Sequence, residues 1–319
     1  MWNSFGFEFV NFYFIPGIVL GCIYALGAIG ITLTFGILRF ANFAHGEVMM
    51  TGAYVTWTLM AVTGALFGWV LHPLIAAIPS IFIMIILFII IDRWFYKPFR
   101  KAPTIKLVIA SFGMMLVIRS LVQVVWGPNQ ITFVKGIAKP NSFIRELTGS
   151  IDMMILIPNK HFLIMSGTLI IVIILGYLLT STRIGKAMRA VSDSPDLALV
   201  TGIDVEVVIR ATWIVGGACA VAAGVFLAMD IQMLETTMGF RMLLPMFAAA
   251  ILGGIGKPYG AVLGGLVIGL AEELVSYPWI GDSALILSLI HISEPTRPER
   301  IWDCGLCVKK KKWGGGGGG

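Results

Sequence analysis

Long apolar stretches alternate with short polar segments along most of the chain. Most of these stretches have the roughly 20 residues that a helix needs to cross the hydrocarbon core of a bilayer. The second is shorter and begins in a polar motif, and the seventh runs into a glycine-rich segment. We expect membrane helices at residues 14–38, 47–62, 70–91, 105–126, 162–179, 207–229, 243–252 and 261–275.

This pattern predicts an all-α integral membrane protein, a polytopic helix bundle of about eight spans with broken or re-entrant helices. The first span is too long for a cleavable signal and lacks a basic segment before it. Lysine and arginine gather in two connections, residues 93–106 and 183–189. Because cytoplasmic loops carry an excess of these residues, both connections are expected in the cytoplasm, and the N-terminus outside.

Composition supports the same class. Hydrophobic residues make up 58% of the chain and charged residues 13%, and the mean hydropathy is +0.91. A soluble domain has roughly a quarter of its residues charged, so this chain has too little polar surface to cover a water-facing globule. The net charge of +6 does not indicate a nucleic-acid site, because four of the positive charges are the lysines at 309–312.

The C-terminal segment, residues 287–319, does not have the character of a folded protein. Residues 287–297 (LSLIHISEPTR) match the in-frame translation of a sequencing adapter, and a lysine run and six glycines follow. We predict a transmembrane domain at residues 1–286 and an artefactual tail at 287–319, so that a last C-terminal helix is missing. The alternative is a disordered basic tail with a glycine-rich end.

No metal or cofactor is expected. Cys304 and Cys307 form a C-x-x-C motif, and His45 and Glu47 form H-x-E, which together suggest a zinc deaminase. The proline that should precede the first cysteine is absent, because Asp303 stands there. Cys22 and Cys219 lie in apolar segments and are expected to pack as small hydrophobic residues.

A first polar cluster lies between the first two spans and contains Asn42, His45, Gly46 and Glu47. Buried polar groups in a membrane are costly unless they are paired. One interpretation is a re-entrant turn that lines the path of a solute. The other is a cytoplasmic loop in which Asn42 caps a helix and Glu47 lies in its first turn.

A second cluster, residues 182–204, has the design of a charged helical hairpin. Arg183, Lys186 and Arg189 recur every three residues, and Gly185 lies among them. Ser194 and Pro195 suit the start of a second short helix, which contains Asp196, and Gly202 suits its end. The hairpin either docks a cytoplasmic partner or serves only as a positive-inside loop.

The remaining features are a glycine run and several lone charges. Gly253, Gly254 and Gly256 precede Lys257, but the run lacks the first glycine and the final Ser or Thr of a phosphate-binding loop. Such glycines in membrane helices favour close contact or a helix break. Arg119 is expected to snorkel outward. Four carboxylates near span ends are expected at the interface: Asp230, Glu235, Glu272 and Glu273.

Several motifs together resemble the permeases of branched-chain amino acid ABC importers, in particular the H-type subunit of the leucine/isoleucine/valine system. The resemblance runs through about nine-tenths of the chain and ends near residues 278–282. The motifs that carry it are 24–30 (YALGAIG), 42–47 (NFAHGE), 52–54 (GAY), 96–100 (YKPFR), 185–190 (GKAMRA) and 250–256 (AILGGIG).

The resemblance implies a multi-pass permease subunit in the bacterial inner membrane that imports branched-chain amino acids. Its partners would be a second, homologous permease subunit, two cytoplasmic ATP-binding subunits and a periplasmic substrate-binding protein. Residues 182–202 would match the loop that inserts into the ATPase. The chain itself would catalyse no reaction.

Four alternatives remain open at this stage. The first is the same fold carrying urea or short amides. The others are an ion-coupled carrier that uses Glu47, a membrane metalloenzyme that uses His45 and Glu47, and an assembly product without function.

Overall fold

The computed structural model describes residues 9–100, 102–134 and 158–276, and the predicted artefactual tail therefore lies outside the described residues. Seven helices in the described part are long and apolar enough to cross a membrane, which confirms the polytopic all-α fold. These candidate spans are Val10–Leu38, His45–Phe67, Pro73–Phe99, Thr104–Trp126, Asn159–Ser181, Val205–Ile231 and Pro258–Val275.

Most spans are single α-helices, and two contain a π-helical turn. The first joins η1 (Val10–Phe14) to α2 (Ile15–Leu38), and the third joins α4 (Pro73–Ile91), η2 (Asp92–Tyr96) and α5 (Lys97–Phe99). The others are α3 (His45–Phe67), α6 (Thr104–Trp126), α8 (Asn159–Ser181), α11 (Val205–Ile231) and α13 (Pro258–Val275). A shorter apolar helix, α12 (Met238–Gly253), completes the set in the described residues.

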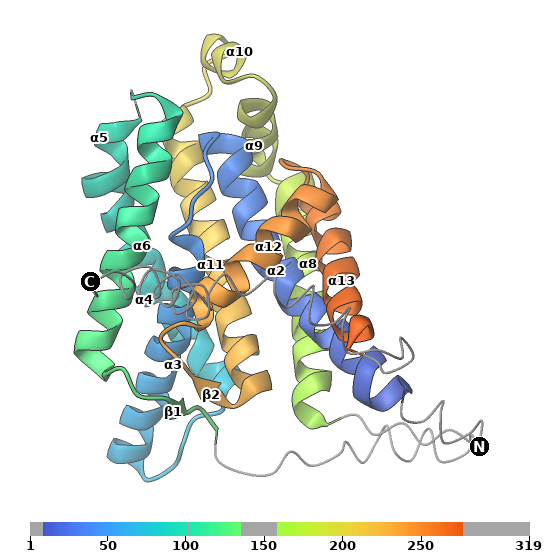
Figure 1. Ribbon diagram of the computed structural model, residues 1–319. Helices are drawn as coiled ribbons and strands as arrows, with labels where there is room; N and C mark the ends of the chain where they lie inside the picture. Colours follow the sequence, from blue (N-terminus) through green and yellow to red (C-terminus); the bar gives the residue numbers. More distant parts are fainter. Residues whose placement is uncertain (1–8, 101, 135–157, 277–319) are drawn as a thin grey trace, which may run out of the picture. The chain divides into compact units, whose positions relative to one another are not determined.

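The two ends of the bundle differ in character. At one end, which we call the basic end, lie α5 and the two short helices α9 (Arg183–Asp193) and α10 (Pro195–Val200) (Figure 1). At the opposite end, β1 (Ile131–Thr132) pairs antiparallel with β2 (Met233–Leu234). Both basic connections therefore lie at the same end, as the charge pattern predicts.

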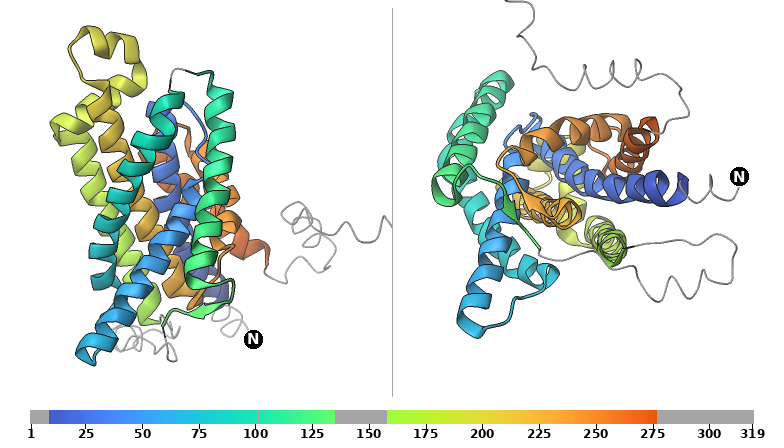
Figure 2. Two further views of the ribbon diagram at one scale, coloured as in Figure 1. Left: turned by 90° about the vertical axis from the view of Figure 1, so that its left-hand side faces the viewer. Right: turned by 60° about the horizontal axis from the view of Figure 1, so that its bottom comes forward.

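The centre of the bundle consists of α2 and α11. In the most apolar window of each span, 78% of the residues of the first span and 72% of those of α11 are buried, against 22–39% in the other five spans. A helix that is apolar all round belongs in the interior. Figure 2 shows the remaining helices placed around these two.

Small residues let α2 approach α13 closely. A Cβ atom added to Gly21 would meet the backbone of Leu266, and one added to Gly269 would collide with the backbone of Gly21. A Cβ atom added to Gly265 would likewise collide with the backbone of Ala25. This is the small-residue packing that brings membrane helices together, in which dispersion contacts replace the hydrophobic effect.

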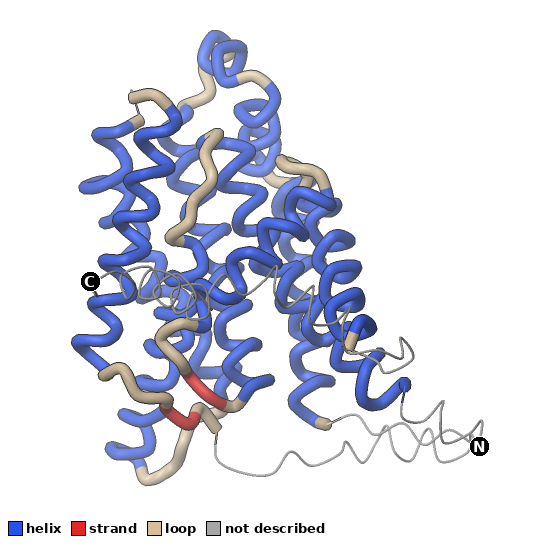
Figure 3. The backbone as a smooth tube through the Cα atoms, in the orientation of Figure 1, coloured by secondary structure: helices blue, strands red, loops and turns tan. Residues whose placement is uncertain are grey.

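The chain breaks its helical path twice inside the bundle. The first break comprises residues 39–44, in which Arg39 has a left-handed backbone (φ 55°) and ends α2. The second begins at Gln232, which has φ 62° and ends α11, and it extends through β2 to Thr237. Both breaks are visible as loops between helices in Figure 3.

The helices that follow the two breaks, α3 and α12, meet at their first turns. A Cβ atom on Gly46 would collide with the carbonyl group of Gly239, and one on Gly239 would collide with that of Gly46. Both helices begin earlier than the hydropathy pattern predicts, since their first turns contain polar or small residues that are buried at this crossing. We call the Gly46–Gly239 contact the crossing point.

Candidate functional site

The first break is held by side-chain hydrogen bonds. Asn42 Oδ1 accepts a hydrogen bond from the Ala44 backbone N–H (3.2 Å) and one from the Tyr96 hydroxyl (3.1 Å). Asn42 thus stabilises the turn from inside the break, and the structure places the N-cap of α3 at Ala44. Asn42, His45 and Glu47 are all buried, so the cluster is not a solvated loop.

His45 begins α3 and packs against the central helix. A Cβ atom on Gly30 of α2 would overlap the imidazole ring. The Nε2 atom of His45 is buried and has no hydrogen-bond partner among the described residues. The structure thus brings together Asn42, His45, Gly46 and Glu47 at the crossing point, and their role in a solute path stays a prediction.

Three polar side chains of α6 reach both breaks from one face of that helix. Ser111 accepts a hydrogen bond from the Phe43 backbone N–H (3.2 Å) in the first break. Gln123 Nε2 donates to Thr236 Oγ1 (3.3 Å) in the second break. Between them, Arg119 binds Glu47. Residues at intervals of four lie on one side of a helix, so Ser111, Arg119 and Gln123 form a polar stripe.

The pair of Arg119 and Glu47 is the centre of this stripe. The Arg119 Nε and Nη2 atoms both donate to Glu47 Oε1, the first at 3.1 Å. The guanidinium also lies 5.2 Å from the ring centroid of Phe240 in α12. The side chain of Glu47 is 1% exposed and that of Arg119 20%. The expectation that Arg119 snorkels outward is therefore wrong, because a buried carboxylate lies within its reach.

The polar stripe also gives the depth of the first break. A helix rises 1.5 Å per residue, so Ser111 lies about 10 Å from the start of α6 at Thr104 and Arg119 about 22 Å. Phe43 and Glu47, which bind these two residues, must lie at comparable depths. Residues 39–44 consequently run from the basic end back into the bundle.

A second ionic cluster lies at the basic end. Arg100 donates to both oxygens of Asp92 (2.5 and 2.6 Å) and to Glu206 Oε1 (2.8 Å). Lys97 forms an ion pair with the other carboxylate oxygen of Glu206, Oε2 (3.4 Å). Burial by itself lowers the pKa of Arg100, but the hydrogen bonds and charges of Asp92 and Glu206 outweigh it and raise this pKa. The cluster fastens α11 to η2 and α5.

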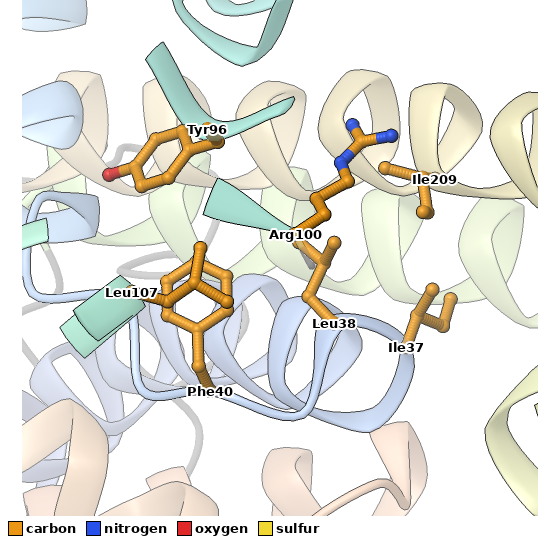
Figure 4. A pocket seen from close by; sticks show the side chains of 7 residues that line it. All are labelled: Ile37, Leu38, Phe40, Tyr96, Arg100, Leu107 and Ile209. Carbon is orange, nitrogen blue, oxygen red and sulfur yellow. The ribbon is translucent and has the colours of Figure 1, made fainter. Parts of the chain in front are cut away.

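A cavity of about 170 Å³ lies beside this cluster. The Arg100 side chain extends along its wall toward Ile209, and the rings of Tyr96 and Phe40 line another part (Figure 4). The lining comes from α2, the first break, η2, the end of α5, α6 and α11. The complete lining is Ile37, Leu38, Phe40, Tyr96, Arg100, Leu107 and Ile209.

The second cluster of the sequence forms the predicted pair of short helices. Thr182 caps α9 by accepting a hydrogen bond from the Gly185 N–H (3.0 Å), and Pro195 occupies the first turn of α10 after Ser194. Gly202 has φ +84°, as a helix-ending residue requires. Four further predicted residues are exposed to solvent: Arg183, Lys186, Arg189 and Asp196.

Gly185 is buried because α9 turns directly onto the end of α8. A Cβ atom at Gly185 would collide with the carbonyl oxygens of Leu178 and Leu179. Large apolar side chains in α10 and its end are nevertheless exposed: Leu197 by 64%, Leu199 by 58% and Val200 by 84%. The hairpin therefore presents both cations and apolar surface at the basic end.

The glycine run lies in the turn between α12 and α13. Gly254 and Gly256 have φ of +90° and +83°, which favours glycine. A Cβ atom on Gly253 would collide with the backbone of Gly260. These glycines therefore form a tight connection between two helices, and the second helix break lies upstream, at residues 232–237.

Three of the other four lone charges have side-chain partners. Asp230 accepts a hydrogen bond from His161 Nε2 (3.1 Å) and forms an ion pair with Lys160 (3.3 Å). These two contacts hold the end of α11 against the start of α8. Glu235 pairs with Arg241 (3.2 Å). Glu272 accepts a hydrogen bond from the Tyr24 hydroxyl (2.7 Å) between α13 and α2.

The described residues contain no group of three or more His, Cys, Asp or Glu side chains placed to hold a metal ion. Cys22 and Cys219 are free thiols buried in α2 and α11. Cys304 and Cys307 lie outside the described residues.

Four residues of the site were not predicted from the sequence: Ser111, Gln123, Tyr96 and Thr236. Only α6 offered a signal that could have found them. Its polar residues Ser111, Arg119 and Gln123 share one helical face, and a polar face on an apolar span indicates a protein-facing side. The partners on other helices, 54 to 113 residues away in sequence, leave no local pattern.

Comparison with known proteins identifies relatives for most of the chain. The family model described as "Branched-chain amino acid transport system / permease component" matches residues 13–290. The high-affinity branched-chain amino acid transport system permease protein LivH of Escherichia coli K12 is 33% identical over 267 residues, which are 82% of this chain and 84% of that protein.

Two further relatives come from other organisms. The corresponding permease protein BraD of Pseudomonas aeruginosa is 34% identical over 268 residues, or 81% of this chain and 83% of BraD. A probable LivH of Methanocaldococcus jannaschii is 29% identical over 272 residues, or 82% of this chain and 79% of that protein. No solved structure matches the chain.

Replacing Arg119 by Met is expected to destabilise the fold strongly. It leaves the Glu47 carboxylate buried without its cation, which typically costs about 3–5 kcal/mol. The double variant Glu47→Gln/Arg119→Met removes both charges and should recover most of this loss. The measurement is unfolding of the purified protein by SDS in mixed micelles.

Arg241→Met provides the matched control, because the Arg241 side chain is 65% exposed in its pair with Glu235. An exposed pair contributes at most about 1 kcal/mol. Equal losses in Arg119→Met and Arg241→Met would show that the pair at the crossing point has no special structural role.

Proposed function

We propose, given that the chain belongs to the family of branched-chain amino acid transport permeases, that it carries branched-chain amino acids through the membrane. It is a multi-pass inner-membrane protein and the permease component of an ATP-driven importer. The observation that carries this proposal is the family match over residues 13–290, which includes six of the seven candidate spans completely and the first span from residue 13 onward.

The permease works in this proposal with separate subunits. A second, homologous permease subunit completes the path, two cytoplasmic ATP-binding subunits supply energy, and a periplasmic binding protein delivers the solute. The chain itself catalyses no bond chemistry, and ATP is hydrolysed by its partners. Its glycine run at 253–256 supports this division, because it forms a turn between two membrane helices.

The α9–α10 hairpin is the surface that we assign to the ATP-binding subunit. Three observations support it: the exposed cations Arg183, Lys186 and Arg189, the exposed apolar side chains of α10, and the position of both helices at the basic end. An exposed apolar patch outside the apolar spans is typical of a protein interface. By the positive-inside rule this end faces the cytoplasm.

The ionic cluster of Arg100 offers a route from this surface into the bundle. The hairpin leads directly into α11, whose first turn carries Glu206, and Glu206 binds Arg100 together with Asp92 of η2. A displacement of α10 would therefore act on α11 and on the third span together. The crossing point, with Asn42, His45, Gly46 and Glu47, is the part of the path that these movements would open.

The docking role predicts that two single changes abolish association with the ATP-binding subunits. Gly185→Asp places a side chain against the carbonyl groups of α8, and Arg189→Glu reverses an exposed charge at the interface. We expect a loss of association of about tenfold or more, since a mismatched interface charge costs several kcal/mol. Co-purification of the assembled importer measures it.

Arg93→Glu is the matched control for Arg189→Glu, because Arg93 is also an exposed arginine in the basic connection before α6. It should leave association intact while removing the same amount of positive charge. Normal co-purification of the Gly185→Asp and Arg189→Glu variants, at normal membrane insertion, would contradict the docking role.

The solute is tested by competition in proteoliposomes that contain the complete importer. Uptake of labelled leucine should be inhibited by unlabelled isoleucine and valine at comparable concentrations, and urea and short amides should have no effect at a hundredfold excess. Uptake should require internal ATP and should not respond to a proton uncoupler. Inhibition by amides, together with amide uptake, would establish the alternative function within the same fold.

A further inference from the structure

We propose that Glu47 and Arg119 form a binding site for the charged head group of the transported amino acid, in which the internal ion pair opens and each partner binds the opposite charge of the solute. The Arg119 guanidinium would take the α-carboxylate and the Glu47 carboxylate the α-ammonium. This inference rests on the proposed function, because it needs a zwitterionic solute.

The position of the pair supports this assignment. Glu47 lies in the first turn of α3, next to the crossing point with α12, and Arg119 reaches it from α6. Two separate elements, α3 and α6, therefore present opposite charges beside the first turn of α12. In membrane carriers, the interrupted ends of helices provide polar groups at the depth where a solute must be held.

The hydrogen bonding of the pair is incomplete. Both contacting nitrogen atoms of Arg119 donate to Glu47 Oε1, while Oε2 is buried and has no partner among the described residues. A carboxylate accepts several hydrogen bonds when it is fully satisfied. An ammonium group has three N–H donors and can bind both carboxylate oxygens of Glu47. The solute would therefore give Glu47 a hydrogen bond on Oε2 that Arg119 does not provide.

Electroneutrality makes the exchange feasible inside a membrane. Separating a buried ion pair leaves two uncompensated charges and is strongly unfavourable. A zwitterion brings one charge of each sign, so each protein group regains a partner of opposite charge and no net charge enters. A solute with only one charge, or with none, cannot replace both contacts.

The surroundings of the pair match a branched apolar side chain. Phe240 lies against Arg119 on one side, with a ring centroid 5.2 Å from the guanidinium carbon. Toward the basic end, the ring of Phe43 lies 4.3 Å from that of Phe112 and 5.3 Å from that of Phe247. Phe112 and Phe240 are exposed by 41% and 42%, so aromatic surface is available beside the pair for an apolar side chain.

The test measures ligand binding to the importer complex without its binding protein, in nanodiscs. Three ligands with the same apolar part are compared: leucine, leucinamide, which lacks the carboxylate, and 4-methylpentanoate, which lacks the ammonium. Each missing charge should weaken binding to the unaltered complex by about 10- to 100-fold.

The decisive result is a selective loss in two variants. Arg119→Met, assayed on the fraction that remains folded, should weaken leucine and 4-methylpentanoate binding by about 10- to 100-fold and should not weaken leucinamide binding, since the carboxylate contact is the one that is lost. Glu47→Gln should weaken leucine and leucinamide and leave 4-methylpentanoate unchanged. Arg241→Gln, which breaks an exposed ion pair in α12, is the control and should change none.

A purely structural pair gives a different pattern. If the pair is purely structural, Arg119→Met and Glu47→Gln should each lower the affinity for all three ligands by the same factor. The exchanged variant Glu47→Arg/Arg119→Glu would then restore leucine binding together with folding. Either result overturns the proposal, as does the absence of leucine binding by the unaltered complex.

Transport by the complete importer separates this inference from the proposed function. If ATP-driven leucine uptake is normal in the unaltered importer but the ligand pattern fails, only the binding site is wrong. If the importer carries amides and not leucine, the proposed function itself fails.

Discussion

The need to pair the polar backbone and side-chain groups of the two helix breaks governs this structure. Lipid offers these groups no hydrogen bonds, so each break requires partners within the bundle. The polar stripe of α6 provides it: Ser111 binds the first break, Gln123 binds the second, and Arg119 binds Glu47 between them. The glycines at the crossing point let the two breaks lie close enough for one helix to serve both.

This arrangement places the buried polar contacts of the chain at the crossing point, where a movement of one helix would change them. The contacts at the crossing point are few, directional and contributed by different helices, whereas the pairing of α2 with α13 is a continuous contact of small residues. At the basic end, Arg100 joins α11 to the third span through two carboxylates. Movements of the α9–α10 hairpin can therefore reach the centre along α11 without unfolding any span.

The sequence predicted well what depends on local composition and poorly what depends on distant contacts. Span positions, the common end of the two basic connections and the short helices around Pro195 follow from hydropathy, charge and capping residues. The starts of α3 and α12 were placed too late, because their first turns are polar or small and are tolerated only at the crossing. Arg119 was interpreted as a lone charge because its partner lies 72 residues away in sequence; the polar face that Arg119 shares with Ser111 and Gln123 indicates that it meets protein but does not identify the partner.

The most direct measurement is a coupling analysis of Gly46→Ala and Gly239→Ala in unfolding by SDS. If the two first turns meet as described, each change should destabilise the protein by about 1–3 kcal/mol, and the double variant should cost little more than one single change. Gly113→Ala, at an open position of α6 with no atom within 4 Å of the added Cβ, should be neutral or slightly stabilising. Additive losses, or losses no greater than that of Gly113→Ala, would contradict the crossing of the two helix breaks on which the account depends.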